Sequence, residues 1–162
     1  MNHISAILGK TVSLLKGIGA GCLVAMMLLT CADVVGRFFN HPIFGSVEIV
    51  GFLSTLAVAV ALPYTHQVKG HIGVEILVRL FPERVQLVFE MITNLVALIL
   101  MGAITWRMTI YAGTMKASGE VSMNLEFPEY LIIYATAFCF LIFWLVIFED
   151  LLTCFKRLKG DK

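Results

Sequence analysis

The chain has 162 residues, 59% of which are hydrophobic, and its mean hydropathy is +0.91. A water-soluble domain of this size needs a much larger share of polar surface, so a soluble enzyme and a soluble binding domain are both excluded. The net charge of +1 gives no indication of a nucleic-acid partner.

Residues 1–16 are predicted to form a separate amphipathic helix that lies in the membrane interface. On a helical wheel the apolar residues fill one face, while Lys10 and Lys16 lie with the polar residues on the other face. Gly17 and Gly19 are expected to form a hinge into the first membrane span. No small-residue cleavage site follows the first apolar stretch, so we do not interpret this region as a signal peptide.

Four long uncharged stretches predict four transmembrane helices. A hydrocarbon core about 30 Å thick needs roughly 20 mostly apolar helical residues, and each stretch reaches that length with its apolar flanks. The predicted fold class is therefore an all-α membrane protein, with an N-terminal interfacial helix followed by a four-helix domain over residues 17–155. The spans are predicted at residues 18–37, 47–65, 85–108 and 129–148.

The segments between and after these spans carry further signals. Residues 72–81 are predicted to form a short amphipathic stretch, and Pro82 indicates the first turn of the third span. That helix is predicted to continue to about Met115. It is then longer than the membrane is thick, so Arg107 is expected on the part that tilts or extends into the periplasm. Residues 156–162 form a basic tail.

The positive charges are distributed unevenly among the predicted loops. Nine of the twelve Lys and Arg lie in the N-terminal segment, the second loop and the tail. The positive-inside rule therefore predicts that both termini and the second loop are cytoplasmic.

Small residues in the first two spans permit close helix contact. Gly17-x-x-x-Gly21 lies in the first span, and the second span contains Ala57, Ala59 and Ala61. The glycine pattern by itself is a weak signal, because glycine is common in membrane helices.

A polar cluster is predicted where the first two spans meet. Asp33 and Arg37 are four residues apart, and Glu48 begins the next span. We interpret the three as a cluster that fixes the first hairpin or binds another membrane subunit. The alternative is that they are interfacial residues that extend to the lipid headgroups. A proton relay is disfavoured because no ionisable residue is predicted to reach the bilayer centre.

Metal and cofactor sites receive little support from the sequence. His71 and Glu75 are four residues apart, but Gly70 interrupts the helix toward His66 and no fourth ligand is evident. A structural role for that loop is favoured, and Glu90, Thr93 and Asn94 are interpreted as interhelical hydrogen-bonding residues.

Several membrane functions lack the residues that they require. All four histidines lie outside the span centres, which disfavours a haem anchor. A self-sufficient exporter would need a carboxylate within its pore, and the first span has none before Asp33. An accessory or scaffold subunit of a larger membrane complex remains. The alternative is a stand-alone four-helix carrier or channel that acts as a homo-oligomer.

Four short motifs, in their order relative to the spans, carry a resemblance to a known family. They are Asp33-x-x-x-Arg37, Gly45-x-x-Glu48, Gly70-His71-Ile72-x-Val74 and Pro128-x-Tyr130. Over about residues 5–155 the chain resembles the small DctQ-type membrane subunit of tripartite ATP-independent periplasmic (TRAP) transporters. Glu75 stands where that family commonly has aspartate, and Tyr130 stands where it commonly has tryptophan. Both differences are mild.

The resemblance implies a multi-pass subunit of the bacterial inner membrane that is not an enzyme and holds no cofactor. Its partners would be membrane lipid, a periplasmic binding protein that delivers an organic acid, and a large multispanning subunit that binds substrate and Na⁺. The small subunit would extend the static scaffold of that large subunit. Asp33, Arg37, Glu48 and His71 are then the candidates for structural or subunit-interface roles.

The predicted topology adds a docking surface. The segment 116–128 faces the periplasm and carries Glu120 and Glu126, with Glu129 just beyond and Lys116 as its only cation. Such an acidic rim is predicted to help dock the binding protein. The alternative is that these are solvated loop charges.

Overall fold

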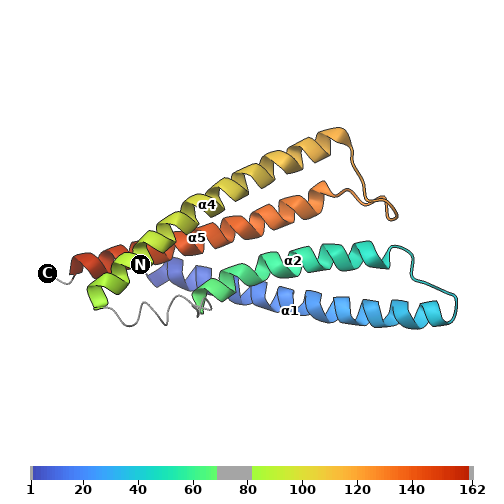
Figure 1. Ribbon diagram of the computed structural model, residues 1–162, viewed down its shortest axis with the longest axis horizontal. Coiled ribbons are helices and arrows are strands. Elements are labelled where there is room, and N and C mark those ends of the chain that lie inside the picture. The colour runs from blue at the N-terminus through green and yellow to red at the C-terminus, as the bar shows by residue number, and fades with distance from the viewer. Residues whose placement is uncertain (1, 69–81, 161–162) are drawn as a thin grey trace.

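A computed structural model describes residues 2–68 and 82–160 (Figure 1). Every element that it describes there is an α-helix, which confirms the predicted all-α class. The elements are α1 (Asn2–Phe38), α2 (Ser46–Gln67), α4 (Glu83–Ser118) and α5 (Tyr130–Gly160).

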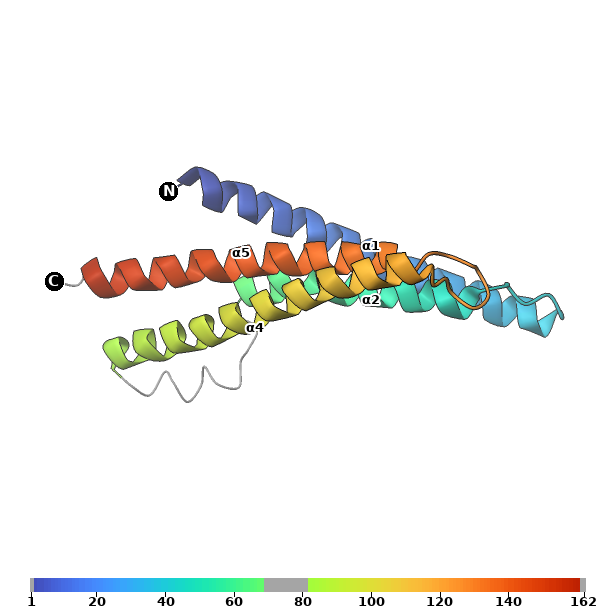
Figure 2. The same ribbon diagram turned by 90° about the horizontal axis from the view of Figure 1, so that it is seen from above.

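The helices form two antiparallel hairpins. In the first, α1 packs on α2, and in the second, α4 packs on α5; the hairpins are joined where α2 packs on α5. Figures 1 and 2 show the start of α1 and the end of α5 at one end of the bundle. The turns 39–45 and 119–129 lie at the opposite end, which we call the loop end.

Each of these helices contains a segment long and apolar enough to cross a membrane. The segments are Leu8–Phe38, Ser46–Gln67, Val85–Ser118 and Tyr130–Lys156. At 1.5 Å per residue, the 22 residues of α2 span about 33 Å, close to the thickness of a bilayer. The other three helices are longer than that. In particular, α5 continues past Phe148, where the fourth span was predicted to end.

The predicted hinge in the first helix is wrong, because α1 is one helix of 37 residues that passes through Gly17 and Gly19. A Cβ atom on Gly19 would lie 2.8 Å from Cγ2 of Val60, so this glycine permits the close approach of α2. Gly17 has no such neighbour within 4 Å. Val12 is fully buried, so part of the apolar face of residues 1–16 packs inside the bundle. Their position in the interface stays a prediction.

The main cluster of buried apolar side chains comes from three helices. Buried residues of α1, α2 and α5 form one cluster, which comprises Leu15, Ala59, Val60, Cys139 and Ile142. By contrast, only 6% of the most apolar stretch of α4 is buried within the subunit, whereas 39% of the corresponding stretch of α5 is buried. The indole Nε1 of Trp144 donates a hydrogen bond to the carbonyl oxygen of Leu98 over 3.1 Å and so links α5 to α4.

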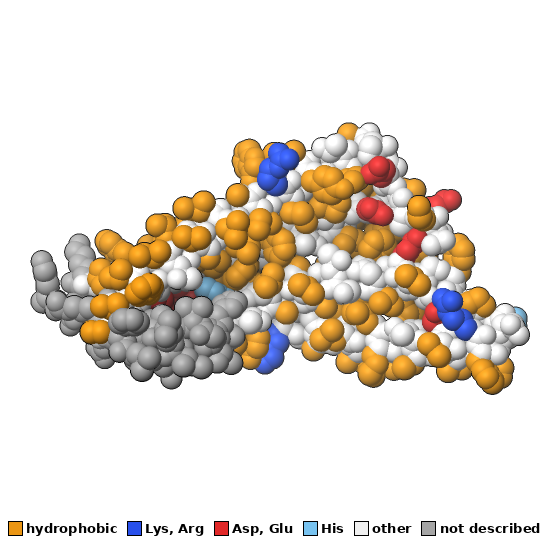
Figure 3. Space-filling model, in the orientation of Figure 1, with side chains coloured by type: hydrophobic (Ala, Val, Ile, Leu, Met, Phe, Trp, Pro, Cys, Tyr) orange, Lys and Arg blue, Asp and Glu red, His pale blue; other side chains and the backbone are white. Residues whose placement is uncertain are grey.

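Large apolar side chains cover much of the outer surface, as the space-filling view shows (Figure 3). A monomeric soluble protein does not expose apolar surface on this scale, so lipid or a membrane partner must cover it. The predicted stretch 72–81 lies outside the described residues.

Candidate functional site

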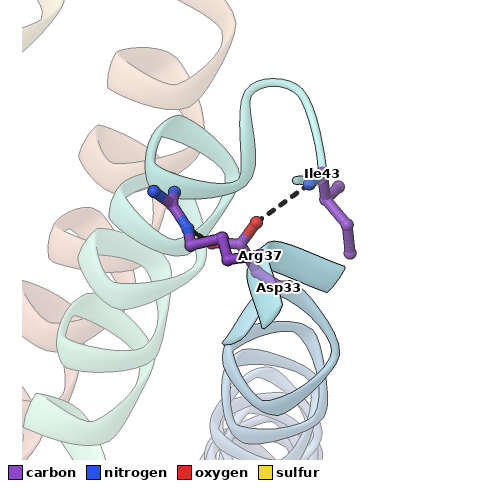
Figure 4. Close-up of polar contacts among 3 residues, drawn as sticks. All are labelled: Asp33, Arg37 and Ile43. Atoms are coloured by element: carbon purple, nitrogen blue, oxygen red, sulfur yellow. Dashed lines mark hydrogen bonds and ion pairs between the residues drawn. The ribbon is translucent and has the colours of Figure 1, made fainter. Parts of the chain in front are cut away.

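The turn between α1 and α2 is closed by Asp33. Its carboxylate accepts one hydrogen bond from Arg37 Nε over 2.8 Å and another from the backbone N–H of Ile43 over 2.9 Å (Figure 4). Asp33 is 7% exposed, whereas the Arg37 side chain is 58% exposed. The acid therefore fixes the turn from within, and the guanidinium remains accessible at the surface.

The geometry of this turn requires a glycine at position 36. The backbone N–H of His41 donates to the carbonyl oxygen of Gly36 over 2.8 Å. A Cβ atom on Gly36 would collide with the carbonyl oxygen of His41. The tight turn thus places Ile43 within reach of Asp33.

Glu48 binds the other turn of the loop end. It lies in the first turn of α2, and one of its carboxylate oxygens accepts hydrogen bonds from the backbone N–H and the side-chain amide of Asn124, both over 2.8 Å. The other oxygen accepts from the backbone N–H of Leu125 over 3.1 Å. The carboxylate of Glu48, on the first hairpin, therefore binds the loop that connects α4 and α5 in the second hairpin.

Apolar contacts support the same junction. The side chain of Leu125 lies directly over Gly45, where a Cβ atom would be 2.6 Å from the leucine Cγ. The rings of Phe52 and Phe127 are 5.7 Å apart between centroids. The loop thus packs on the first turns of α2 as well as hydrogen-bonding to it.

The segment 119–129 is also ordered by its own hydrogen bonds. The backbone N–H of Ser122 donates to the carbonyl oxygen of Phe127 over 2.9 Å. The N–H of Phe127 donates in return to the Ser122 hydroxyl over 3.2 Å. Val121 and Pro128 form an isolated antiparallel bridge. These contacts make the loop a compact hairpin.

The predicted cluster of Asp33, Arg37 and Glu48 is thus divided in two. Asp33 and Arg37 pair as the helical spacing predicted, while Glu48 faces the 119–129 loop instead of Arg37. The contact of Glu48 with Asn124 and Leu125 was not predicted from the sequence. An acid in the first turn of a helix indicates an interaction with that helix's own N-terminus, and no signal in the sequence pointed to the distant loop.

The acidic docking candidates lie around this hairpin. Glu120 and Glu126 are exposed, and Glu129 is partly exposed at the start of α5. Met123 at the tip of the loop is 98% exposed. Figure 3 shows acidic side chains gathered at the loop end, with apolar surface beside them. The region therefore presents negative charge around an apolar tip.

At the opposite end, other polar contacts tie the helices together. Lys16 Nζ donates to the Tyr64 hydroxyl over 3.0 Å and lies 4.3 Å from the centre of its ring. His66 Nε2 is 3.1 Å from the Asp150 carboxylate, which connects α2 with α5. His66 is thus placed in a helix contact, while His71 and Glu75 lie outside the described residues. Asn94 is buried in α4.

Comparison with known proteins gives one family match. Residues 26–157 match the family described as tripartite ATP-independent periplasmic transporters, DctQ component. No curated protein and no solved structure matches the chain. The matched region begins within α1, includes both turns of the loop end, and stops three residues before the end of α5. The chain belongs to the DctQ family and is a small membrane subunit of a TRAP transporter.

Proposed function

We propose that this subunit is a static scaffold in a Na⁺-coupled, binding-protein-dependent importer of an organic acid in the bacterial inner membrane. The main support is the attachment of the 119–129 loop to α2 by Glu48, which fixes the two hairpins relative to each other at the loop end. A rigid end is suited to holding partners, because a docking surface must keep its shape while the transporting subunit moves.

The charge distribution of the chain also favours a supporting role. Between Glu48 and Glu75, and between Glu90 and Glu120, the sequence has no Asp or Glu. Binding of Na⁺ or of a proton within a membrane commonly uses carboxylates at mid-membrane depth. The coupling ion and the substrate are therefore assigned to the large subunit.

We assign the loop end to the periplasm, because the positive-inside rule predicts cytoplasmic termini, and the start of α1 and the end of α5 lie at the other end of the bundle. In that orientation the acidic residues around Met123 face the binding protein. Charges at the rim of a transient interface mainly raise the association rate and fix orientation, and salt screens them.

The docking role is tested by reversing Glu120 and Glu126 to lysine in the reconstituted transporter. The concentration of binding protein needed for half-maximal uptake should rise, and the rise should be larger at low ionic strength. Glu149→Lys, at the opposite end of α5, changes the charge by the same amount as reversing Glu120 or Glu126 alone, and it is the control for either reversal. An unchanged concentration dependence at low salt would assign docking to the large subunit alone.

Reconstitution also tests the scaffold role itself. Uptake into proteoliposomes should require the large subunit, the binding protein and an inward Na⁺ gradient, with this chain alone inactive. Uptake by this chain alone, together with a homo-oligomer in mild detergent, would instead support a stand-alone carrier or channel.

A further inference from the structure

Arg107 lies at an unusual depth for a charged residue. On α4 it lies about midway between two contacts with α5. On one side, Leu98 and Gly102 adjoin Trp144. On the other side, a Cβ atom on Gly113 would lie 3.8 Å from the Tyr134 hydroxyl oxygen. The level of Arg107 on α5 is therefore between Tyr134 and Trp144. The sequence of α5 is uncharged from Tyr130 to Phe148, so Arg107 lies beside the middle of that span.

This depth differs from the periplasmic position expected from the sequence. Moving Arg107 to the membrane surface would carry the first turns of α5 into water with it. That half of the helix exposes Leu131 and Phe138, at 45% and 61%. The packing of α4 on α5 therefore keeps Arg107 within the apolar layer.

Arg107 also points away from the rest of the subunit. At 100° per residue, its position on α4 lies roughly 120° to 180° from Leu98, Gly102 and Gly113, which face α5. Arg107 is exposed, and its outer face carries Leu100 and Ile110, which are 55% and 47% exposed. No hydrogen bond or ion pair of Arg107 is found within the part of the chain that the structure describes.

We propose that Arg107 forms an ion pair with a membrane-embedded carboxylate of the large transporter subunit, which packs on the outer face of α4. A charged side chain in the apolar layer requires such a partner or a route to water. The lipid phosphates are a poorer match, because half of the α5 span corresponds to about 14 Å of helix, more than one side chain reaches.

A second copy of this chain does not fit the same position. Every Asp and Glu lies at or beyond the ends of the uncharged stretches, so another copy has no carboxylate at this depth. A symmetric contact through this face would also bring two Arg107 side chains together, and like charges in an apolar layer repel strongly. The complementary group must come from a different membrane protein, so the inference rests on the proposed function.

The test uses the tagged subunit expressed with its large partner. Arg107→Met removes the charge and leaves a shorter, unbranched apolar side chain, and Lys116→Met is the matched control near the end of the same helix. We expect Arg107→Met to lower the retained large subunit by roughly tenfold or more, because it leaves the partner carboxylate unpaired. Lys116→Met should retain wild-type amounts.

Two further measurements separate the removal of an ion pair from damage to the fold. The isolated Arg107→Met subunit should melt at the same temperature as the wild type or higher, because methionine suits an apolar surface better than arginine. Neutralising the matching acid of the large subunit should restore assembly with Arg107→Met, since removing both members of a buried pair costs little.

Equal retention for the two methionine variants, or no restoration by any intramembrane acid of the large subunit, would overturn the ion pair. Loss of bound phospholipid without loss of the large subunit would assign Arg107 to lipid and likewise overturn it. If the wild-type subunit retains no large partner at all, the proposed function fails instead.

Discussion

Gly45 offers a quantitative test of the junction between the two hairpins. It precedes α2 with a φ of 72°, in the left-handed region, and its α-carbon faces the side chain of Leu125. Gly45→Ala should therefore be destabilising for two reasons. The left-handed conformation costs a residue with a side chain about 1–2 kcal/mol. Displacing a packed leucine adds about 1–3 kcal/mol.

Gly119 is a matched control for the backbone contribution. Its φ is 70°, nearly the same as that of Gly45, but a Cβ atom there would meet nothing within 4 Å. Gly119→Ala should therefore cost only the backbone term of about 1–2 kcal/mol. The difference between the two alanine variants then measures the contact between Gly45 and Leu125.

A double variant isolates that contact more directly. In a Leu125→Ala background the added Cβ at Gly45 no longer meets a leucine, so Gly45→Ala should cost about as much as Gly119→Ala. The free energy of unfolding can be measured by titrating denaturing detergent into mild-detergent micelles and following helical circular dichroism. Equal losses for Gly45→Ala and Gly119→Ala in the wild-type background would refute the packing of the loop on α2.

Three further outcomes are expected. Glu48→Ala should speed hydrogen exchange at the backbone amides of Asn124 and Leu125, while exchange in the turn between α1 and α2 stays unchanged. Unchanged exchange at those two loop amides would contradict the contact between Glu48 and the loop. Arg37→Ala should weaken assembly or uptake, because it removes a partner of a shielded acid, and Lys10→Ala, at an exposed site, should not; similar yields and uptake for both would argue against a role for the turn. With the native cysteines replaced, a cysteine at Ser118 should react with an impermeant thiol reagent on whole cells and one at Gly160 should not; the reverse pattern would invert the topology.

The helices were predictable from the sequence because long apolar runs have few other structural solutions in a membrane. Pro82 correctly indicated the start of α4, and the predicted start of the fourth span at residue 129 lies one residue before α5. The hinge at Gly17 and Gly19 was predicted wrongly, since glycine in a helix signals either flexibility or close packing. Only the position of Val60 on the neighbouring helix shows that Gly19 serves packing.

The candidate site was predictable only where its residues are close in sequence. Asp33 and Arg37 are one helical turn apart, and their pairing follows from that spacing. Glu48 and Asn124 are 76 residues apart, so their contact depends on how the second hairpin packs on the first. Periodicity within each helix carries no information about that packing.

The uneven burial of the helices bears on how the subunit would meet its partners. The main cluster of buried apolar residues comes from α1, α2 and α5, whereas α4 is attached through α5 and through the loop that Glu48 holds. A helix held along one side only has most of its apolar surface available for another membrane protein. The contact that anchors the loop end thus also fixes the start of α5 relative to α2, and through α5 the position of α4. If α4 carries the face for the large subunit, as we propose for Arg107, then Glu48→Ala should weaken that assembly indirectly, by loosening the position of α4.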